Sequence, residues 1–313
     1  MLYRRRIERK NGQVANKVED VIEALERLDL LDYQSVVRWP EPPSDEFRVR
    51  KLKLSHFGRA TVPKADGESW ESVIIEMEEA ARFGSDEMLS EVLDVLAWYA
   101  PIHTARKDWG IYIRESAVLL LAGRIVARIP GGMTADHGMV WGAIRSAVFC
   151  LYHHEAFHHY VESFAIRLEL VEEESRYLPY HRDVYGRPGE VDEPLEEGLA
   201  CAEQLRRRKK ERGLQGLPHE VHLATEHLLK DWIPTLGPGY RQGVALAGDD
   251  AFRKGRKRLS SQIQSASSKP ADDGSRWHLI ADESHKGLCN CRSATYWVPD
   301  RGFHYGGSGV LGL

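Results

Sequence analysis

The 313-residue sequence has little cysteine and no long apolar run. Its four cysteines are too few for the disulfide framework of a small secreted protein. No apolar stretch approaches the roughly 20 residues that a membrane-spanning helix needs. The basic start, MLYRRRIERKNG, is not followed by the apolar segment of a secretory signal. These absences favour a cytoplasmic protein with no membrane partner.

The sequence also lacks a strong excess of either charge. The formal net charge is -4, and 42% hydrophobic and 29% charged residues are ordinary proportions for a globular protein. No overall field therefore favours nucleic acid or anionic lipid as a partner. The exception is the basic run Arg253–Arg258, which lies upstream of Trp277, Tyr296 and Trp297. We interpret this segment first as a solvated helix face, and the alternative is contact with nucleic acid or an acidic partner.

Helical periodicity of apolar residues dominates the rest of the chain. From about 136 to 174 there is no proline and the periodicity persists, which predicts one long helix or two with a bend. Other segments follow the same rules of periodicity and turn composition. They predict helices at 12–31, 69–99 (two helices parted near residue 84), 115–128, 193–212, 218–232 and 248–266, a strand at 109–113, a loop at 177–189, and short strands in the last 38 residues. The pattern indicates a predominantly helical α+β protein.

The most informative motif is His154-Glu155-Ala156-Phe157-His158, in the middle of the long predicted helix. Residues four apart on a helix are neighbours, so the two imidazoles lie one turn apart on the same face and can hold one zinc ion. The intervening glutamate then lies beside the metal, where it can take a proton from a metal-bound water. This HExxH spacing predicts a metal-dependent hydrolase, and the leading interpretation is a peptidase.

A catalytic zinc site usually has three protein ligands plus water, so two histidines are not sufficient. The best third candidate is Glu197, because it begins a second predicted helix that can return alongside the first. The small residues Gly198 and Ala200 would let the two helices approach closely around a metal. The adjacent Glu196 is an alternative ligand.

The HExxH motif followed by Glu197-Gly198-Leu199-Ala200 resembles the gluzincin metallopeptidases, over about residues 109–215. In that group the third ligand is a glutamate on a downstream helix. The resemblance implies a zincin-like core in which His154, His158 and Glu197 bind Zn2+ and Glu155 is the general base.

Two features depart from the gluzincin pattern. The gap before the glutamate is long, so Tyr177–Glu193 would be an inserted loop. Cys201 stands four residues after Glu197, where many members have an Asp or Asn that supports a ligand histidine.

The mechanism that follows is hydrolysis of a peptide bond by glutamate-assisted attack of zinc-bound water. Zinc lowers the pKa of its water to about 7, and Glu155 accepts the proton as hydroxide attacks the carbonyl. A donor that faces the metal stabilises the oxyanion, and the candidates are Tyr180, His181 and Tyr185. An extended protein or peptide substrate would pair with a strand, for which residues 111–113 are the candidate.

Other residues near the motif have two interpretations. His153 and His159 point away from the ligand face, and are predicted to be solvated or outer groups of the site. Glu162 either orients His158 or is a solvated helix charge. Cys150 and Cys201 are predicted to be buried thiols.

The C-terminal segment has a further candidate metal group. His285, Cys289 and Cys291 could hold a second, structural zinc that His278 or His304 would complete. We favour the other interpretation, which is ordinary reduced thiols in a small sheet.

We therefore expect three regions. These are a mainly helical N-terminal region (1–105), a zincin-like metallopeptidase core with the active-site helix (106–245), and a small C-terminal α+β module (246–313). The leading hypothesis is a zinc metallopeptidase that acts on a protein or peptide. The alternative is a non-catalytic or toxin-like module that binds RNA or a protein partner through its basic and aromatic C-terminal segment.

Overall fold

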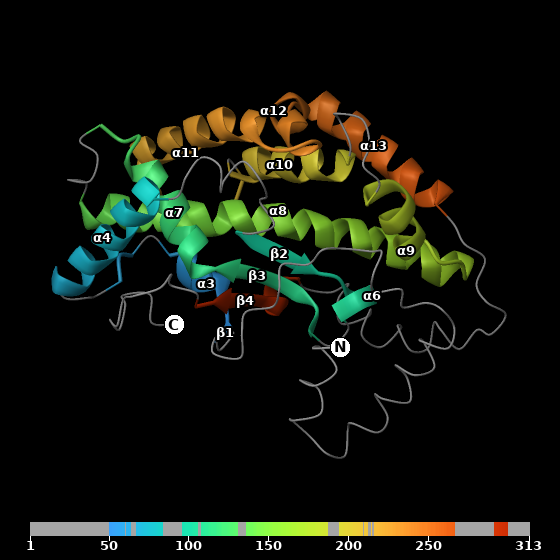
Figure 1. Cartoon of the computed structure of the whole chain (residues 1–313), viewed down its shortest axis with the longest axis horizontal. Helices are drawn as coiled ribbons and strands as arrows, with labels where there is room; N and C mark the ends of the chain where they lie inside the picture. Colours follow the sequence, from blue (N-terminus) through green and yellow to red (C-terminus); the bar gives the residue numbers. More distant parts are fainter. Residues whose placement is uncertain are drawn as a thin grey trace, which may run out of the picture.

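The long helix α8 (His137–Glu172) lies at the centre of the molecule (Figure 1). At 1.5 Å per residue, its 36 residues span about 54 Å. The Asp136 side chain accepts a hydrogen bond from the backbone N–H of Met139 at 2.9 Å and so caps the first turn. The helix ends at Glu173, whose left-handed conformation, with a φ of 55°, stops it.

The structure is a computed structural model that describes residues 50–59, 61–63, 67–83, 96–105, 108–130, 136–186, 194–208, 210–211, 214, 216–266 and 291–299.

A small mixed sheet covers one side of α8 (Figure 1). Its strand order is β1 (Arg50–Lys51), β4 (Thr295–Val298), β3 (Gly110–Arg114) and β2 (Ala97–Ala100). The central strands β3 and β4 are parallel, and the two outer pairs are antiparallel. Side chains alternate between the faces of a strand, and Ile111, Ile113 and Trp297 are buried in the core beside α8.

A helical layer covers the opposite side of α8 (Figure 1). It contains α10 (Leu195–Arg208), α11 (His219–Trp232), α12 (Gly243–Leu246) and α13 (Asp249–Ser265). Toward the N-terminal end of α8, helix α7 (Glu115–Val126) packs against both α8 and α4 (Gly67–Phe83). Shorter elements complete the described part: α3 (Leu54–Phe57), α6 (Ile102–Ala105), α9 (Tyr177–Tyr180), a π-helical turn (His181–Tyr185) and 3-10 turns at Ile233–Thr235, Tyr240–Gln242 and Cys291–Ala294. The long helix is therefore the middle of three layers.

The segment before α12 crosses α10 through close backbone contacts. A Cβ on Gly198 would lie 2.9 Å from the carbonyl oxygen of Gly239. Gly239 has a φ of 85°, and a Cβ there would lie 2.6 Å from the carbonyl oxygen of Pro194. The expectation that Gly198 lets α8 and α10 approach was wrong, because this glycine makes room for the crossing segment instead.

Most of the predicted elements are confirmed. The protein is a predominantly helical α+β structure with a small mixed four-stranded sheet. The periodic segment 136–174 is one helix, and helices α7, α10, α11 and α13 and strand β3 lie where the sequence predicts them. Apolar periodicity over three or more turns was the reliable signal.

Two predicted elements were wrong. Residues 97–99 belong to strand β2, although the periodicity of 69–99 predicted a helix there. A short apolar run does not distinguish a buried strand from a buried helix, and pairing with β3 decides the conformation. The first part of the predicted loop 177–189 consists of α9 and the π-helical turn, because buried tyrosines anchor it on α8 and α10.

Other expectations stay predictions. The helix predicted at 12–31 lies outside the described residues. The division into 1–105, 106–245 and 246–313 stays a prediction, although the sheet joins strands from all three ranges. Among the described residues, no helix combines the length and apolar character needed to cross a membrane.

Candidate metal centre

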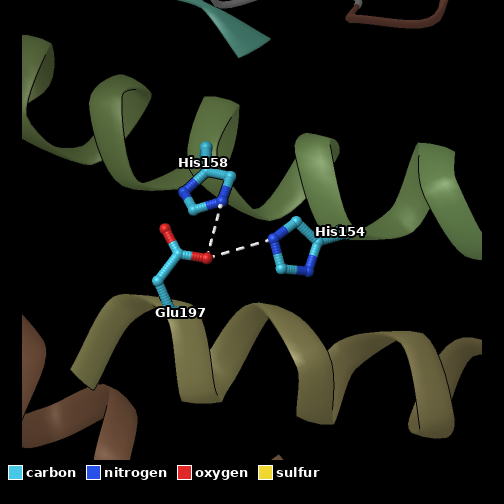
Figure 2. Close-up of side chains that lie close together, drawn as sticks. All are labelled: His154, His158 and Glu197. Atoms are coloured by element: carbon cyan, nitrogen blue, oxygen red, sulfur yellow. Dashed lines mark hydrogen bonds and ion pairs between the residues drawn. The ribbon is translucent and has the colours of Figure 1, made fainter. Parts of the chain in front are cut away.

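Three side chains converge between α8 and α10 (Figure 2). His154 and His158 project from consecutive turns of α8, and Glu197 reaches toward them from α10. The Glu197 Oε2 atom lies 3.1 Å from His154 Nε2 and 3.6 Å from His158 Nε2. All three residues are buried. We call them the metal triad, and within the described part of the chain they are the one group of this kind that could hold a metal ion.

The helix pair brings these residues together because α10 runs antiparallel to α8. Glu197 faces His154 and His158, Cys201 faces His154, and Gln204 donates to the backbone carbonyl of Cys150 at 3.1 Å. These α10 residues are three or four apart, so they form one stripe along the helix. The HExxH spacing supplies the two histidines, and the stripe supplies the carboxylate.

The donor set fits zinc. Zn–N and Zn–O bonds of about 2.1 Å at tetrahedral angles place adjacent ligand atoms about 3.4 Å apart. The observed separations of 3.1 and 3.6 Å, from the Glu197 oxygen to the two Nε2 atoms, lie on either side of that value. Two imidazoles and one carboxylate are also a ligand set of catalytic zinc sites, in which a water completes the coordination.

Outer contacts fix the orientation of both imidazoles. Glu196 Oε1 lies 2.7 Å from His158 Nδ1, the ring nitrogen that faces away from the triad, and the Tyr180 hydroxyl donates to Glu196 Oε2 at 2.8 Å. Cys201 Sγ lies 3.8 Å from His154 Nδ1. A ligand histidine usually donates its other N–H to a carboxylate, which sets its tautomer and angle. Glu196 is therefore placed as a support for His158, and Glu197 is the carboxylate of the triad.

Without a metal, the triad is held by charge. Burial raises the pKa of Glu197, but the positive charge of His158 and hydrogen bonds from both histidines outweigh burial, so its pKa lies well below the ordinary value. Burial likewise opposes the charge of His158, but Glu197 and Glu196 hold its pKa well above 6.5. Burial lowers the pKa of His154, which stays neutral. A carboxylate therefore faces one charged and one neutral imidazole.

Of the residues predicted to act in catalysis, Tyr185 contacts the triad and His181 lies against Tyr185. Glu155 is buried on α8 directly after His154. The Tyr185 hydroxyl donates to Glu197 Oε1. The ring of His181 lies 4.6 Å from that of Tyr185, and its Nδ1 has no hydrogen-bond partner among the described residues. Burial, followed by the charge of His158, lowers the pKa of His181 to about 4, so it is neutral at pH 7.

The polar neighbours of the motif are buried, which contradicts their interpretation as solvated groups. His153 is buried and lies 3.3 Å from Glu211, and His159 is buried against Trp109 with its Nδ1 2.9 Å from the Tyr99 hydroxyl. Neither is solvated. Glu162 is fully buried, and its hydrogen bonds go to residues of β2 and α6 and not to His158.

The remaining predicted residues have different outcomes. Cys150 and Cys201 are buried thiols, as expected, and burial raises the pKa of Cys150 to about 12. The second metal group at Cys289 and Cys291 lies outside the described side chains. The basic run of α13 is exposed except at Gly255, and its role in binding nucleic acid stays a prediction.

The strand predicted to bind substrate does not have a free edge. Residues 111–113 lie in β3, which pairs with β2 on one side and β4 on the other. This prediction was wrong, because periodicity predicts a strand but not its position in a sheet.

Comparison with protein-family models gave no match, and searches of curated proteins and of solved structures gave none either. The site is therefore interpreted from its own geometry, which establishes a buried group of two histidines and one glutamate that could hold a metal ion.

Proposed function

We propose that this protein is a zinc-dependent hydrolase of the gluzincin type that cleaves a peptide bond in a protein or peptide substrate. The observation that supports the proposal is the convergence of two Nε2 atoms and one carboxylate oxygen at zinc-ligand spacing, within an HExxH helix and its partner helix. A zincin-like core is part of this proposal.

The chemistry would be divided between the ion and the side chains around it. Bound by His154, His158 and Glu197, zinc supplies a Lewis acid that polarises a carbonyl and acidifies water. Glu155 accepts a proton from the attacking water and passes it to the leaving amine. An HExxH glutamate without competing solvent is suited to this, and Glu155 is buried.

Two side chains are placed to stabilise negative charge on the substrate oxygen. Tyr185 already directs its hydroxyl at the triad, through its hydrogen bond to Glu197. His181 packs on Tyr185 and is neutral at pH 7, so one ring nitrogen keeps a proton to donate. A donor of this kind typically contributes on the order of 100-fold or more to the rate.

The exposed fractions of the site residues indicate from which side a substrate would reach the triad. His154 and Glu197 are 0% and 1% exposed, whereas His158 is 8% exposed and Tyr185 is half-buried. We infer that the scissile carbonyl approaches past Tyr185 and His158. The π-helical turn then lies between substrate and solvent and excludes bulk water.

The test separates metal binding from hydrolysis. Purified wild-type protein should contain about one zinc per chain, and a His154→Ala, His158→Ala double variant should contain none. Incubation with a mixed peptide library, followed by mass spectrometry, should reveal cleavage by the wild-type protein. Glu155→Gln should keep the zinc and lose the cleavage. A Glu155→Gln variant that cleaves at the wild-type rate would contradict the assignment.

A further inference from the structure

A second group of buried charged side chains lies on α8 beyond the metal triad. Glu162 and Glu169 are seven residues apart, close to two helical turns, and so project from the same face. They are 0% and 1% exposed. Ionised carboxylates at this depth need charge and hydrogen-bond partners. We call these two residues and His103, which contacts both, the capping cluster.

Each carboxylate caps a short helix that lies against α8. Glu162 accepts hydrogen bonds from two backbone N–H groups at the start of α6, at 2.9 Å each. Glu169 accepts hydrogen bonds from the backbone N–H groups of Arg176 and Tyr177 at the start of α9, at 2.7 and 2.9 Å. The first N–H groups of a helix have no partner inside it, so these contacts fix where α6 and α9 begin.

His103 joins the two caps. Its Nδ1 lies 2.7 Å from Glu162 Oε1, and its Nε2 lies 2.8 Å from Glu169 Oε2. Each nitrogen faces a carboxylate oxygen, so both must donate and the ring is an imidazolium. Burial lowers the pKa of His103, but the two carboxylates outweigh it and raise the pKa to about 10. At neutral pH the cluster is one cation between two anions.

A continuous series of ring contacts leads from this cluster to the metal triad. The Tyr177 ring stacks on His103 with centroids 4.8 Å apart and lies 5.7 Å from the ring of His181. His181 lies 4.6 Å from Tyr185, whose hydroxyl donates to Glu197. The segment capped by Glu169 therefore ends in direct contact with a proposed zinc ligand.

The same segment also supports the second histidine of the triad. Tyr180, in the last position of α9, donates to Glu196 at 2.8 Å, and Glu196 lies 2.7 Å from His158 Nδ1. A shift of α9 would therefore move the supports of both His158 and Glu197. A hydroxyl that moves 1 Å away from its acceptor loses much of the strength of its hydrogen bond.

We propose that His103 and Glu169 are positioning residues for the metal centre: they fix the start of α9, and through it the hydroxyls of Tyr180 and Tyr185 that hold Glu196 and Glu197. The inference rests on the metal centre of the proposed function, and does not depend on whether the substrate is a peptide.

The test compares His103→Gln and Glu169→Gln with Val118→Ala, a truncation at a fully buried position of α7. All three variants should lose stability, but the control lies on α7, toward the opposite end of α8 from α9 (Figure 1). The measurements are the zinc dissociation constant, by competition with a chelator, and the visible absorption spectrum of the Co2+-substituted protein. The two cluster variants should bind zinc about tenfold more weakly and have an altered Co2+ spectrum. Val118→Ala should leave both unchanged.

A purely structural role predicts a different result. The cluster variants would then have lower melting temperatures, with zinc affinity and Co2+ spectrum as in the wild-type protein, and the inference would be overturned. Glu169→Gln can keep an acceptor oxygen on the two backbone N–H groups only by directing its amide NH2 at the donating Nε2 of His103, so one of its two contacts is lost. It supplies the comparison if His103→Gln does not fold.

Failure of the proposed metal centre gives a separate signature, because the wild-type protein would then bind no zinc. The nitrogen chemical shifts of the His158 ring, in metal-free protein labelled at histidine, test the positioning role in that case. His103→Gln or Glu169→Gln should move these shifts, and Val118→Ala should not. Unchanged shifts in the cluster variants would overturn the inference without reference to zinc.

Discussion

The metal triad and the capping cluster each combine histidine and glutamate and each take two members from α8, but their arrangements are opposite. In the triad, two imidazoles direct their Nε2 atoms at one carboxylate oxygen, at 3.1 and 3.6 Å. In the cluster, one imidazole lies between two carboxylates and uses both of its nitrogens, at 2.7 and 2.8 Å.

The arrangement, and not the composition, separates a candidate metal site from a structural ion pair. Ligand atoms that converge on one point leave a place for a cation. Donors and acceptors that are all paired, as in the cluster, leave none. In metal-free protein both groups are stabilised by charge, but only the triad would exchange a proton for zinc when the metal binds.

The largest expected effect is the loss of zinc binding from the triad. Glu197→Ala removes one of three ligands and should weaken zinc binding by on the order of 100-fold or more, whereas Glu196→Ala removes an outer support and should cost about tenfold. Titration calorimetry with zinc measures both. Equal losses for the two neighbouring glutamates would contradict the assignment of Glu197 as the ligand.

Substitutions in the capping cluster should lower the stability of the protein more than substitutions in the triad do, and they should do so whether or not zinc is present. His103→Ala leaves Glu162 and Glu169 buried without their cation, which should lower the free energy of unfolding by about 3–5 kcal/mol. Urea unfolding with and without zinc measures the loss, which should be present in both conditions. Zinc at 100 times the wild-type dissociation constant should stabilise the wild-type protein by about 2.7 kcal/mol and Glu197→Ala by no more than about 0.4 kcal/mol.

The contribution of His103 should depend on pH. Its folded-state pKa of about 10 lies above the ordinary 6.5, so its stabilisation is fully present below pH 6.5 and is lost as the pH rises through 10. The groups that face it are Glu162, Glu169 and Tyr177. The difference in unfolding free energy between wild type and His103→Gln should therefore narrow between pH 7 and pH 10.5. A constant difference over this range would show that the ring is not charged in the folded protein.

The smallest expected effect concerns the thiol beside the triad. Cys201 Sγ lies 3.8 Å from His154 Nδ1, and a thiol is a weak hydrogen-bond partner. Cys201→Ala should therefore change zinc affinity by no more than a few-fold, and Cys201→Asp, which introduces a carboxylate beside His154, should change it more. Competition with a chelator, measured on both variants, shows which of them changes zinc affinity more.

The sequence predicted the triad better than its surroundings. The HExxH motif has a fixed spacing on one helix, and Glu197 begins the next predicted helix, so both follow from local periodicity and zinc chemistry. The sequence did not predict that His103 is the partner of Glu162. His103 lies 59 residues earlier in the chain, beside a strand that periodicity predicted as the end of a helix. A contact of this range depends on how β2 pairs with β3, which no local pattern predicts.

The supports of the triad were partly predictable. Tyr180 and Tyr185 were candidates because they lie between the two ligand helices, and the structure brings both to the carboxylates. Their segment was predicted as a loop, because its aromatic and turn residues have no helical periodicity. The carboxylate of Glu169 that caps α9 comes from another element, and its role was visible only in the fold.

The most direct measurement is a crystal structure of the zinc-loaded protein, with the anomalous signal of zinc used to locate the ion. The account predicts one strong peak between α8 and α10, about 2.1 Å from His154 Nε2, from His158 Nε2 and from a Glu197 oxygen. A zinc peak bound by other residues, or an occupied site in which the carboxylate of Glu197 stays outside bonding distance, would contradict it.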